Sequence, residues 1–316
     1  MTSRGDKASP NNRDTGLDRQ IKRLEDRRAS KEDARAAGDL TGQKARSSAE
    51  KLLTRSTSGA IYAVVTLVCL FVGPITTTLL IAAESWLCCS EFFRIARMGG
   101  RMPNELFGLA AALLFPLAAY ANGLLALTLV IFMLLMACAA WYVFTPRANI
   151  ADVAVTVLGP LYTSLAFSSI VLIRMYDNGL PGALLTLGVM FSIWGNDAMA
   201  YFVGSALGRH KLAPRISPNK SVEGFVGGIL GSVIVWVLVS LFLVPKLDLG
   251  LAAACGLVVG FAGVIGDLFE SRLKRGVGVK DSGNLIPGHG GLLDRSDSML
   301  FGGMAAFFLL HFGGIL

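Results

Sequence analysis

Charged residues are scarce in this sequence. Asp, Glu, Lys and Arg make up 16% of its 316 residues, whereas hydrophobic residues make up 53% and the mean hydropathy is +0.58. This composition excludes an ordinary soluble enzyme and an intrinsically disordered chain. Residues 1–55 nevertheless hold 14 of the 29 Lys and Arg and 9 of the 22 Asp and Glu. We therefore expect a polar, disordered cytoplasmic tail over residues 1–55 and a transmembrane domain over residues 56–316.

The sequence also lacks the patterns of a secreted or zinc-binding protein. Its five cysteines lie in apolar stretches, with neither Cys-x-x-Cys nor Cys/His metal spacing, so we expect no disulfide and no zinc. The first residues contain no apolar stretch, and we expect no cleaved signal peptide. Most of the net charge of +7 lies in the tail, which argues against a nucleic-acid partner.

Long apolar runs fill the rest of the chain. A helix needs about 20 mostly apolar residues to cross the hydrocarbon core of a bilayer. Nine segments approach this length: 59–73, 75–93, 105–121, 123–143, 150–173, 182–204, 223–244, 249–266 and 299–315. The first two are separated only by Gly73-Pro74, so one kinked helix is the alternative there.

Positive charge distinguishes the two alternatives, because Lys and Arg near the ends of spans collect on the cytoplasmic side. Nine spans with the N-terminus inside place 27 of the 29 Lys and Arg in the cytoplasm, leaving only Arg174 and Lys246 outside. Merging the first two spans would divide the positive charges almost equally. The predicted fold is therefore all-α, a polytopic integral membrane protein with nine transmembrane helices and a cytoplasmic N-terminus.

Both long polar segments of this domain, 204–223 and 267–298, fall on the cytoplasmic side. If the eighth helix continues past residue 266, Asp267 lies one turn from Ser271, and Glu270 one turn from Lys274. If the last helix starts near residue 294, its carboxylates at 294 and 297 share a face. Charges beside a bilayer are costly and usually mark a functional site.

Two acidic edges around a basic, glycine-rich loop predict a site for a metal and phosphates. Mg²⁺ takes carboxylate oxygens together with substrate phosphates, so the carboxylates at the two edges of the loop form a plausible metal site. Nearby cations would balance phosphate charge: Lys274, Arg275, Lys280 and Arg295. The alternative is that these charges only hold a cytoplasmic loop together.

Residues 271–297 resemble the signature of the phosphatidate cytidylyltransferases, also called CDP-diacylglycerol synthases. The matching positions are Ser271, Leu273, Lys274-Arg275, Lys280-Asp281, Gly283, Ile286-Pro287, His289-Gly290-Gly291, Asp294-Arg295 and Asp297. A second block is similar to the same family over residues 197–204 and 208–225. Ser205 and Ser296 depart from the family pattern, and Ser205 removes one phosphate contact that the resemblance would imply.

The resemblance implies transfer of a cytidylyl group from CTP to phosphatidic acid, giving CDP-diacylglycerol and pyrophosphate. It implies Mg²⁺ as cofactor and leaves a second metal ion and a homodimer open. The attacking phosphate is already an anion, so the chemistry requires alignment and charge stabilisation rather than a strong base. The expected location is the inner cell membrane, with membrane lipid as substrate and the active site facing the cytoplasm.

We expect the following residues to form the site. Asp267, Asp294, Asp297, Lys274 and Ser271 are the catalytic candidates, and the first two are also the metal candidates. The substrate-binding candidates are Asp197, Lys211, Ser217, Lys220, Arg275, Lys280, Asp281, His289 and Arg295. An unpaired carboxylate within a span is costly, so we expect Asp197 to face a polar cavity. Glu91, which lies in no motif, is interpreted as pairing with Arg94.

Three alternatives remain open. The protein resembles in outline polyprenol or phytol kinases and archaeal lipid cytidylyltransferases, which act on other lipids. An ion or solute transporter would explain a carboxylate within the sixth span, although the ionisable residues gather in two loops rather than along a path through the bilayer. An inactive membrane scaffold is the third alternative.

Overall fold

The computed structural model describes residues 22–30, 32, 57–283, 285 and 290–316. Residues 1–56 and 57–316 form two separate compact units. In the first unit, residues 22–30 are helical. The predicted disorder of the rest of the tail falls on residues outside the described part of the chain.

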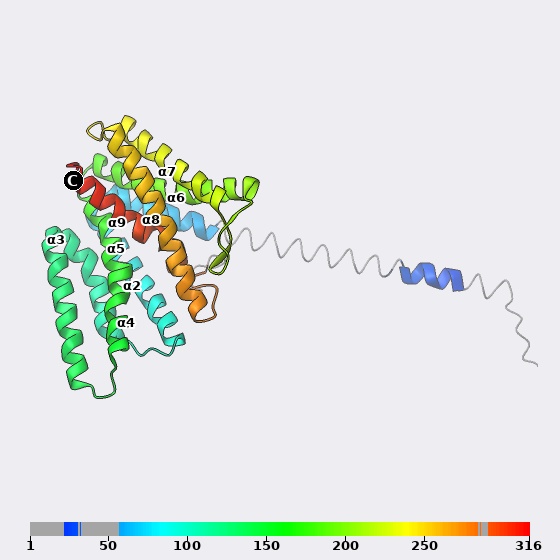
Figure 1. Cartoon of the computed structure of the whole chain (residues 1–316), viewed down its shortest axis with the longest axis horizontal. Coiled ribbons are helices and arrows are strands. Elements are labelled where there is room, and N and C mark those ends of the chain that lie inside the picture. Colours follow the sequence, from blue (N-terminus) through cyan, green and yellow to red (C-terminus); the bar gives the residue numbers. More distant parts are fainter. Residues whose placement is uncertain (1–21, 31, 33–56, 284, 286–289) are drawn as a thin grey trace, which may run out of the picture. The chain divides into compact units, whose positions relative to one another are not determined.

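The second unit is built from long helices joined by short connections (Figure 1). A helix over Thr57–Val72 precedes α2 (Pro74–Met98) and α3 (Glu105–Phe144). A continuous helical stretch follows, formed by α4 (Ile150–Pro160), the π-helical turn η1 (Leu161–Leu165) and α5 (Ala166–Arg174). The remaining helices are α6 (Leu180–Leu207), α7 (Val222–Phe242), α8 (Leu249–Gly276) and α9 (Leu293–Phe312).

The first two apolar runs form two helices, separated at Gly73. The helix over Thr57–Val72 ends there, and Pro74 opens α2, where its missing N–H and fixed φ suit a first helical position. The hydroxyls of Thr76 and Thr77 donate to the Cys69 carbonyl at 2.6 and 3.1 Å. These bonds satisfy a carbonyl that the end of the first helix leaves without a partner.

The long helix α3 contains two of the predicted segments. Asn122 and Gly123 leave helical geometry inside it, and Gly123 has a φ of +56°, which a residue with a Cβ rarely adopts. The break falls where the sequence predicts the boundary between residues 105–121 and 123–143. At its start, the side chain of Asn104 caps the helix by accepting from the Phe107 N–H.

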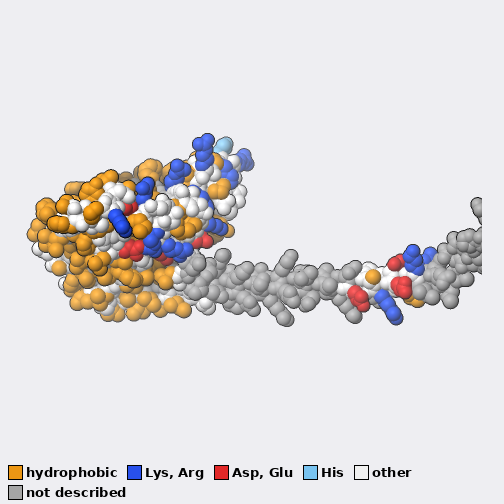
Figure 2. All heavy atoms as spheres, turned by 90° about the horizontal axis from the view of Figure 1, so that it is seen from below, with side chains coloured by type: hydrophobic (Ala, Val, Ile, Leu, Met, Phe, Trp, Pro, Cys, Tyr) orange, Lys and Arg blue, Asp and Glu red, His pale blue; other side chains and the backbone are white. Residues whose placement is uncertain are grey.

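Five helical stretches of the described residues are long and apolar enough to cross a membrane. They are Glu105–Phe144, Ile150–Arg174, Leu180–Leu207, Val222–Phe242 and Leu249–Gly276. Figure 2 shows hydrophobic side chains covering much of the visible body, with Lys and Arg gathered over one part of it. The molecule is therefore a helical membrane protein, while the count of nine spans and the orientation stay predictions.

The polar segment between α6 and α7 contains the one departure from the all-α prediction in the described chain. Strands β1 (Lys211–Ala213) and β2 (Ser217–Ser221) pair antiparallel, with Lys211 opposite Ser221. The hairpin is short and polar and includes Pro218 at an edge position, so it lacks the alternation of apolar residues that identifies a strand in a sequence. Its end is joined directly to α7, where Ser221 caps the helix by accepting from the Gly224 N–H.

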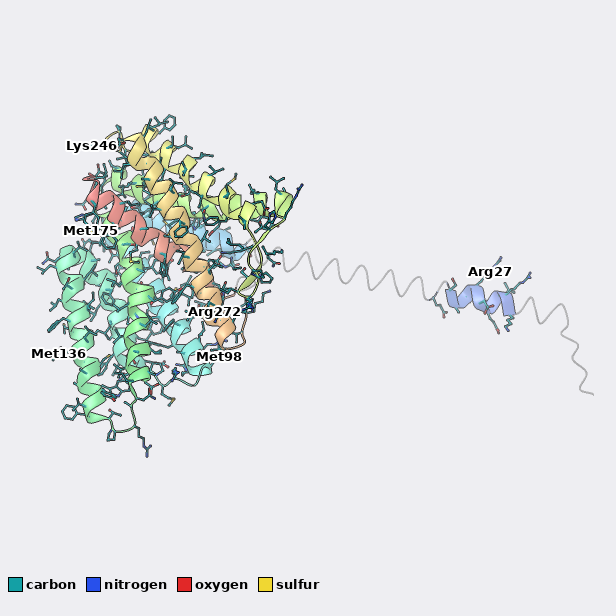
Figure 3. The ribbon with its side chains drawn as sticks, viewed as in Figure 1. Arg27, Met98, Met136, Met175, Lys246 and Arg272 are labelled. Carbon is teal, nitrogen blue, oxygen red and sulfur yellow. The ribbon has the colours of Figure 1, made fainter. Side chains whose placement is uncertain are left out.

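The ends of the helices divide into two groups along the bundle. Figure 3 shows Lys246 and Met175 toward one end and Arg272 and Met98 toward the other. Lys246 precedes α8, and Arg272 lies in its last turns. The hairpin and the start of α9 belong to the end of the bundle at which α8 finishes, because they share a cavity with residues of that helix.

Candidate active site

A cavity of about 820 Å³ lies among the first helix, α6, the β-hairpin, α7, α8 and α9. Its polar lining includes Ser58, Asp197, Ser205, Asn219, Lys220, Ser221, Asp267, Asp294, Arg295 and Asp297. Its apolar lining includes Tyr62, Ala63, Trp194, Tyr201, Leu212, Phe225 and Val264. One hollow thus combines a charged wall with an aromatic and aliphatic wall.

Close helix packing brings the charged wall together. A Cβ added at Gly224 in α7 would lie 2.7 Å from the Ala200 carbonyl in α6, and one added at Gly266 in α8 would collide with the Asp297 carbonyl in α9. Glycine is therefore required at both crossings for the backbones to approach this closely. The second crossing places Asp267, the next residue of α8, beside the first turns of α9.

Lys220 of the hairpin reaches across to α8. Its Nζ lies 2.6 Å from Asp267 Oδ2, and the Ser271 hydroxyl donates to Asp267 Oδ1 at 3.2 Å. The second contact has the spacing of one helical turn that the sequence predicts. The two polar segments, far apart in the sequence, therefore meet at the Asp267 carboxylate.

Asp294, in the first turn of α9, is held by three groups. Lys274 Nζ lies 2.6 Å from its Oδ1, and the Ser282 and Gly291 N–H groups donate to its Oδ2 at 2.9 and 2.8 Å. Burial alone would raise its pKa, but hydrogen bonds with Glu270, Lys274 and Gly291 outweigh burial and hold the pKa of Asp294 below its ordinary value. Asp294 is therefore a carboxylate that orders the loop between α8 and α9 as well as lining the cavity.

Six of the predicted site residues line the cavity: Asp197, Lys220, Asp267, Asp294, Arg295 and Asp297. In addition, the Ser298 hydroxyl lies 3.5 Å from Asp197 Oδ1, which connects α9 to α6. Asp197 thus faces a cavity with other charged side chains. The sequence predicts this position, because an unpaired carboxylate within an apolar helix is costly. The catalytic and binding roles of these residues stay predictions.

Other predicted residues lie away from the cavity lining. Lys274 is largely buried and forms ion pairs with Glu270, one turn before it, and with Asp294. The side chains of Lys211, Arg275, Lys280 and Asp281 are exposed, and Ser217 is half-buried on β2. His289 lies outside the described residues.

The charges of the cavity fit a bound divalent cation. Among the described lining residues, four carboxylates face two cationic side chains, those of Lys220 and Arg295. A phosphate-bearing substrate would be repelled by this excess of negative charge unless a cation were present. In the described part of the chain, no three His, Cys, Asp or Glu side chains form a complete metal site. Mg²⁺ does not require one, because it commonly uses one or two carboxylates, water and substrate phosphates.

The sequence missed two contributors to the site. Tyr62 in the first helix lines the cavity, and no motif marks it. Glu91 in α2 is buried, and it accepts hydrogen bonds from Ser282 and from the start of α9. The predicted pairing of Glu91 with Arg94 is not among the ion pairs of the described residues, and Arg94 is exposed. One feature of the sequence could have identified Glu91: a charged residue within an apolar span is costly to bury and usually marks a site.

Comparison with known proteins identifies the family to which this chain belongs. The profile of the cytidylyltransferase family matches residues 53–313. A Bacillus subtilis protein named phosphatidate cytidylyltransferase is 34% identical over 264 residues, covering 81% of this chain and 96% of its own length. Proteins of the same name from Staphylococcus saprophyticus and Staphylococcus epidermidis are 43% and 39% identical over 138 and 155 residues. Those matches cover 44% and 49% of this chain, and 53% and 58% of the two relatives. The chain belongs to the cytidylyltransferase family.

Proposed function

We propose that this protein transfers the cytidylyl group of CTP to phosphatidic acid. An oxygen of the lipid phosphate forms a bond to the α-phosphorus of CTP, and the bond between the α- and β-phosphates breaks. The products are CDP-diacylglycerol, a precursor for phospholipid synthesis, and pyrophosphate. The family membership and the names of the relatives support this reaction.

The observation that carries the proposal is the two-sided cavity. Lys220, Asp267 and Arg295 provide charged groups for phosphates and a cation. Tyr62, Trp194 and Phe225 on the other side provide a surface for the apolar part of a lipid. A cavity with both surfaces suits a reaction between a water-soluble nucleotide and a membrane lipid.

We assign Mg²⁺ to the acidic side of this cavity, at Asp267 and Asp294. Asp267 is the stronger candidate, because only the two side chains of Lys220 and Ser271 contact its carboxylate in the described structure, whereas three groups hold that of Asp294. Asp197 and Asp297 line the same cavity and can orient water or serve as further ligands. When bound, Mg²⁺ supplies positive charge that offsets the charge on the α-phosphate and on the leaving pyrophosphate.

The protein's own cations have separate tasks in this proposal. Lys220 lies on the hairpin beside Asp267, where it can bind a phosphate while remaining held by the carboxylate. Arg295 lines the cavity from α9 and offers a planar set of donors to a second phosphate. Asp294 keeps the start of α9 in place through its contacts with Lys274 and Gly291. These residues bring two anions together without a general base.

The proposed setting is the inner cell membrane, with nine spans and the cavity open to the cytoplasm. The cavity is lined by Asp267 of α8, five residues before Arg272, and Figure 3 shows Arg272 toward the end of the bundle away from Lys246. That end carries most of the Lys and Arg of the domain, which the positive-inside rule places in the cytoplasm. The bacterial source of the relatives supports the same location.

The test is an assay of the purified protein in detergent with CTP and phosphatidic acid. CTP should be consumed, with formation of CDP-diacylglycerol, when phosphatidic acid is the acceptor, and should not be consumed with a polyprenol or another lipid alcohol. Consumption of CTP with one of those lipids instead would contradict the substrate assignment. A labelled solute that crosses sealed vesicles without any consumption of CTP would favour a transporter.

A further inference from the structure

Glu91 is a buried carboxylate of α2 with 7% of its surface exposed. Its Oε2 accepts from the Ser282 hydroxyl at 2.8 Å and from the Leu293 N–H at 2.9 Å. Its Oε1 accepts from the Leu292 N–H at 3.0 Å. Three donors from a segment about 200 positions later in the chain therefore meet at one carboxylate.

These donors lie on both sides of the loop between α8 and α9. Ser282 precedes residues 283–291, and Leu292 and Leu293 follow them. A Cβ added at Gly283 or at Gly291 would collide with the Glu91 carboxylate. The side chain of Glu91 thus fills the space between the two ends of the loop and holds them together.

The same carboxylate caps α9. The first N–H groups of a helix have no partner within the helix, and negative charge near them is stabilising. The residue at the start of α9, Leu292, has no side chain able to accept such a bond, and no capping bond from its own side chain is found. Glu91 supplies the missing acceptor from another helix.

Two of the residues that contact Glu91 also bind Asp294, which lines the cavity. The Ser282 N–H donates to Asp294, while the Ser282 hydroxyl donates to Glu91. Gly291, which packs against Glu91, also donates its N–H to Asp294. Glu91 is not among the residues that line the cavity in the described structure, but it holds the segments that place Asp294 there.

We propose that Glu91 is a positioning residue for cytidylyl transfer, which rests on the function proposed above. It fixes the ends of the loop and the first turn of α9, so that Asp294, Arg295 and Asp297 face the cavity. The apolar wall of the cavity comes from the first helix, α6, the hairpin, α7 and α8, whereas the hydrogen bonds given above for Glu91 reach only Ser282, Leu292 and Leu293. Loss of Glu91 should therefore affect the nucleotide more than the lipid.

The test variant is Glu91→Gln, which keeps the shape but removes the charge and turns an N–H₂ group toward N–H or O–H donors. We expect the KM for CTP to rise about tenfold and kcat to fall about tenfold, while the KM for phosphatidic acid changes less than about twofold. A smaller fraction of folded enzyme would lower kcat but would leave the KM for CTP unchanged. An unchanged KM for CTP therefore overturns the proposal.

Two further variants sharpen the result. Asp152→Asn removes another buried carboxylate, which accepts the Met102 main-chain N–H at 2.8 Å and forms no hydrogen bond with the loop or with α9 among the described residues. It should leave the KM for CTP unchanged. Ser282→Ala removes one donor to Glu91, so the double variant with Glu91→Gln should lose less than the product of the two single losses. A double variant whose loss equals the product of the two single losses would contradict the contact between Ser282 and Glu91.

Amide hydrogen exchange separates this inference from the proposed function. Peptides covering Ser282, Leu292 and Leu293 should exchange faster in Glu91→Gln than in wild type, and not in Asp152→Asn. Unchanged exchange overturns the structural part of the inference. Wild-type protein that makes no CDP-diacylglycerol overturns the proposed function and the catalytic role of Glu91 together, whereas active wild type with a fully active Glu91→Gln overturns the inference alone.

Discussion

Lys220 Nζ lies 2.6 Å from Asp267 Oδ2, which joins the β-hairpin to α8 across the cavity. The two residues belong to different polar segments, 204–223 and 267–298. The pair therefore fixes the hairpin over the charged wall. It also keeps a cation within the cavity when no substrate is present.

Removal of the Lys220 charge should impair catalysis more than folding. We expect Lys220→Met to lower kcat/KM by on the order of 100-fold, because a fixed cation beside a reacting phosphate acts mainly in the transition state. Lys246→Met is the matched control, since Lys246 is exposed and lies toward the other end of the bundle. A steady-state assay of both variants checks this, and equal activities would contradict the assignment of Lys220.

The packing of α8 against α9 should depend on Gly266. Gly266→Ala would force a methyl group against the Asp297 carbonyl, and we expect it to cost about 1 to 3 kcal/mol of stability. Gly276→Ala in the same helix meets nothing within 4 Å and should be neutral or stabilising. Thermal unfolding in detergent compares the two variants. Equal melting temperatures would show that the helices do not approach as closely as described.

Lys274 should contribute to stability through its two ion pairs. Lys274→Met leaves Glu270, which is fully buried, and Asp294 without their shared cation. Breaking a buried pair on one side typically costs about 3 to 5 kcal/mol. Arg272→Met, two positions earlier and exposed, should change stability little. Thermal unfolding of both variants tests this, and a Lys274→Met protein as stable as wild type would contradict a stabilising role of the two ion pairs.

Chelation should abolish activity if the acidic wall holds Mg²⁺. We expect EDTA to stop CDP-diacylglycerol formation and added Mg²⁺ to restore it. Asp197→Asn should raise the Mg²⁺ concentration for half-maximal activity about tenfold, because groups around a metal site typically influence affinity by this amount or more. Titration of activity with Mg²⁺ gives the value. Full activity in EDTA would show that the cavity works without a divalent cation.

Local sequence patterns predicted most of the helices and part of the site. Apolar runs located the helices, and glycine or proline marked the breaks at Gly73 and Gly123. Helical spacing correctly placed Ser271 beside Asp267 and Lys274 beside Glu270. Such patterns are readable because they depend on neighbours within one or two turns.

Local sequence patterns did not predict the contacts between distant segments. The ion pair of Lys220 with Asp267 and the contacts of Glu91 depend on how helices cross, which apolar periodicity in a membrane does not determine. The hairpin over β1 and β2 was missed because its strands are short and lack the alternation of apolar and polar residues that identifies a strand. Lys274 was expected to bind phosphates. Helical spacing predicted Glu270 beside it, but no local pattern predicted its second ion pair, with Asp294 of α9.

The most direct test of the central claim follows the phosphorus atoms of CTP. Purified protein is incubated with phosphatidic acid, Mg²⁺ and CTP labelled at either the α- or the γ-phosphate, and lipid and water-soluble products are then separated. A cytidylyltransferase predicts the α-label in the lipid product and the γ-label in pyrophosphate. Appearance of the γ-label in the lipid would identify a lipid kinase, and the absence of both labels from the lipid would contradict the proposed reaction.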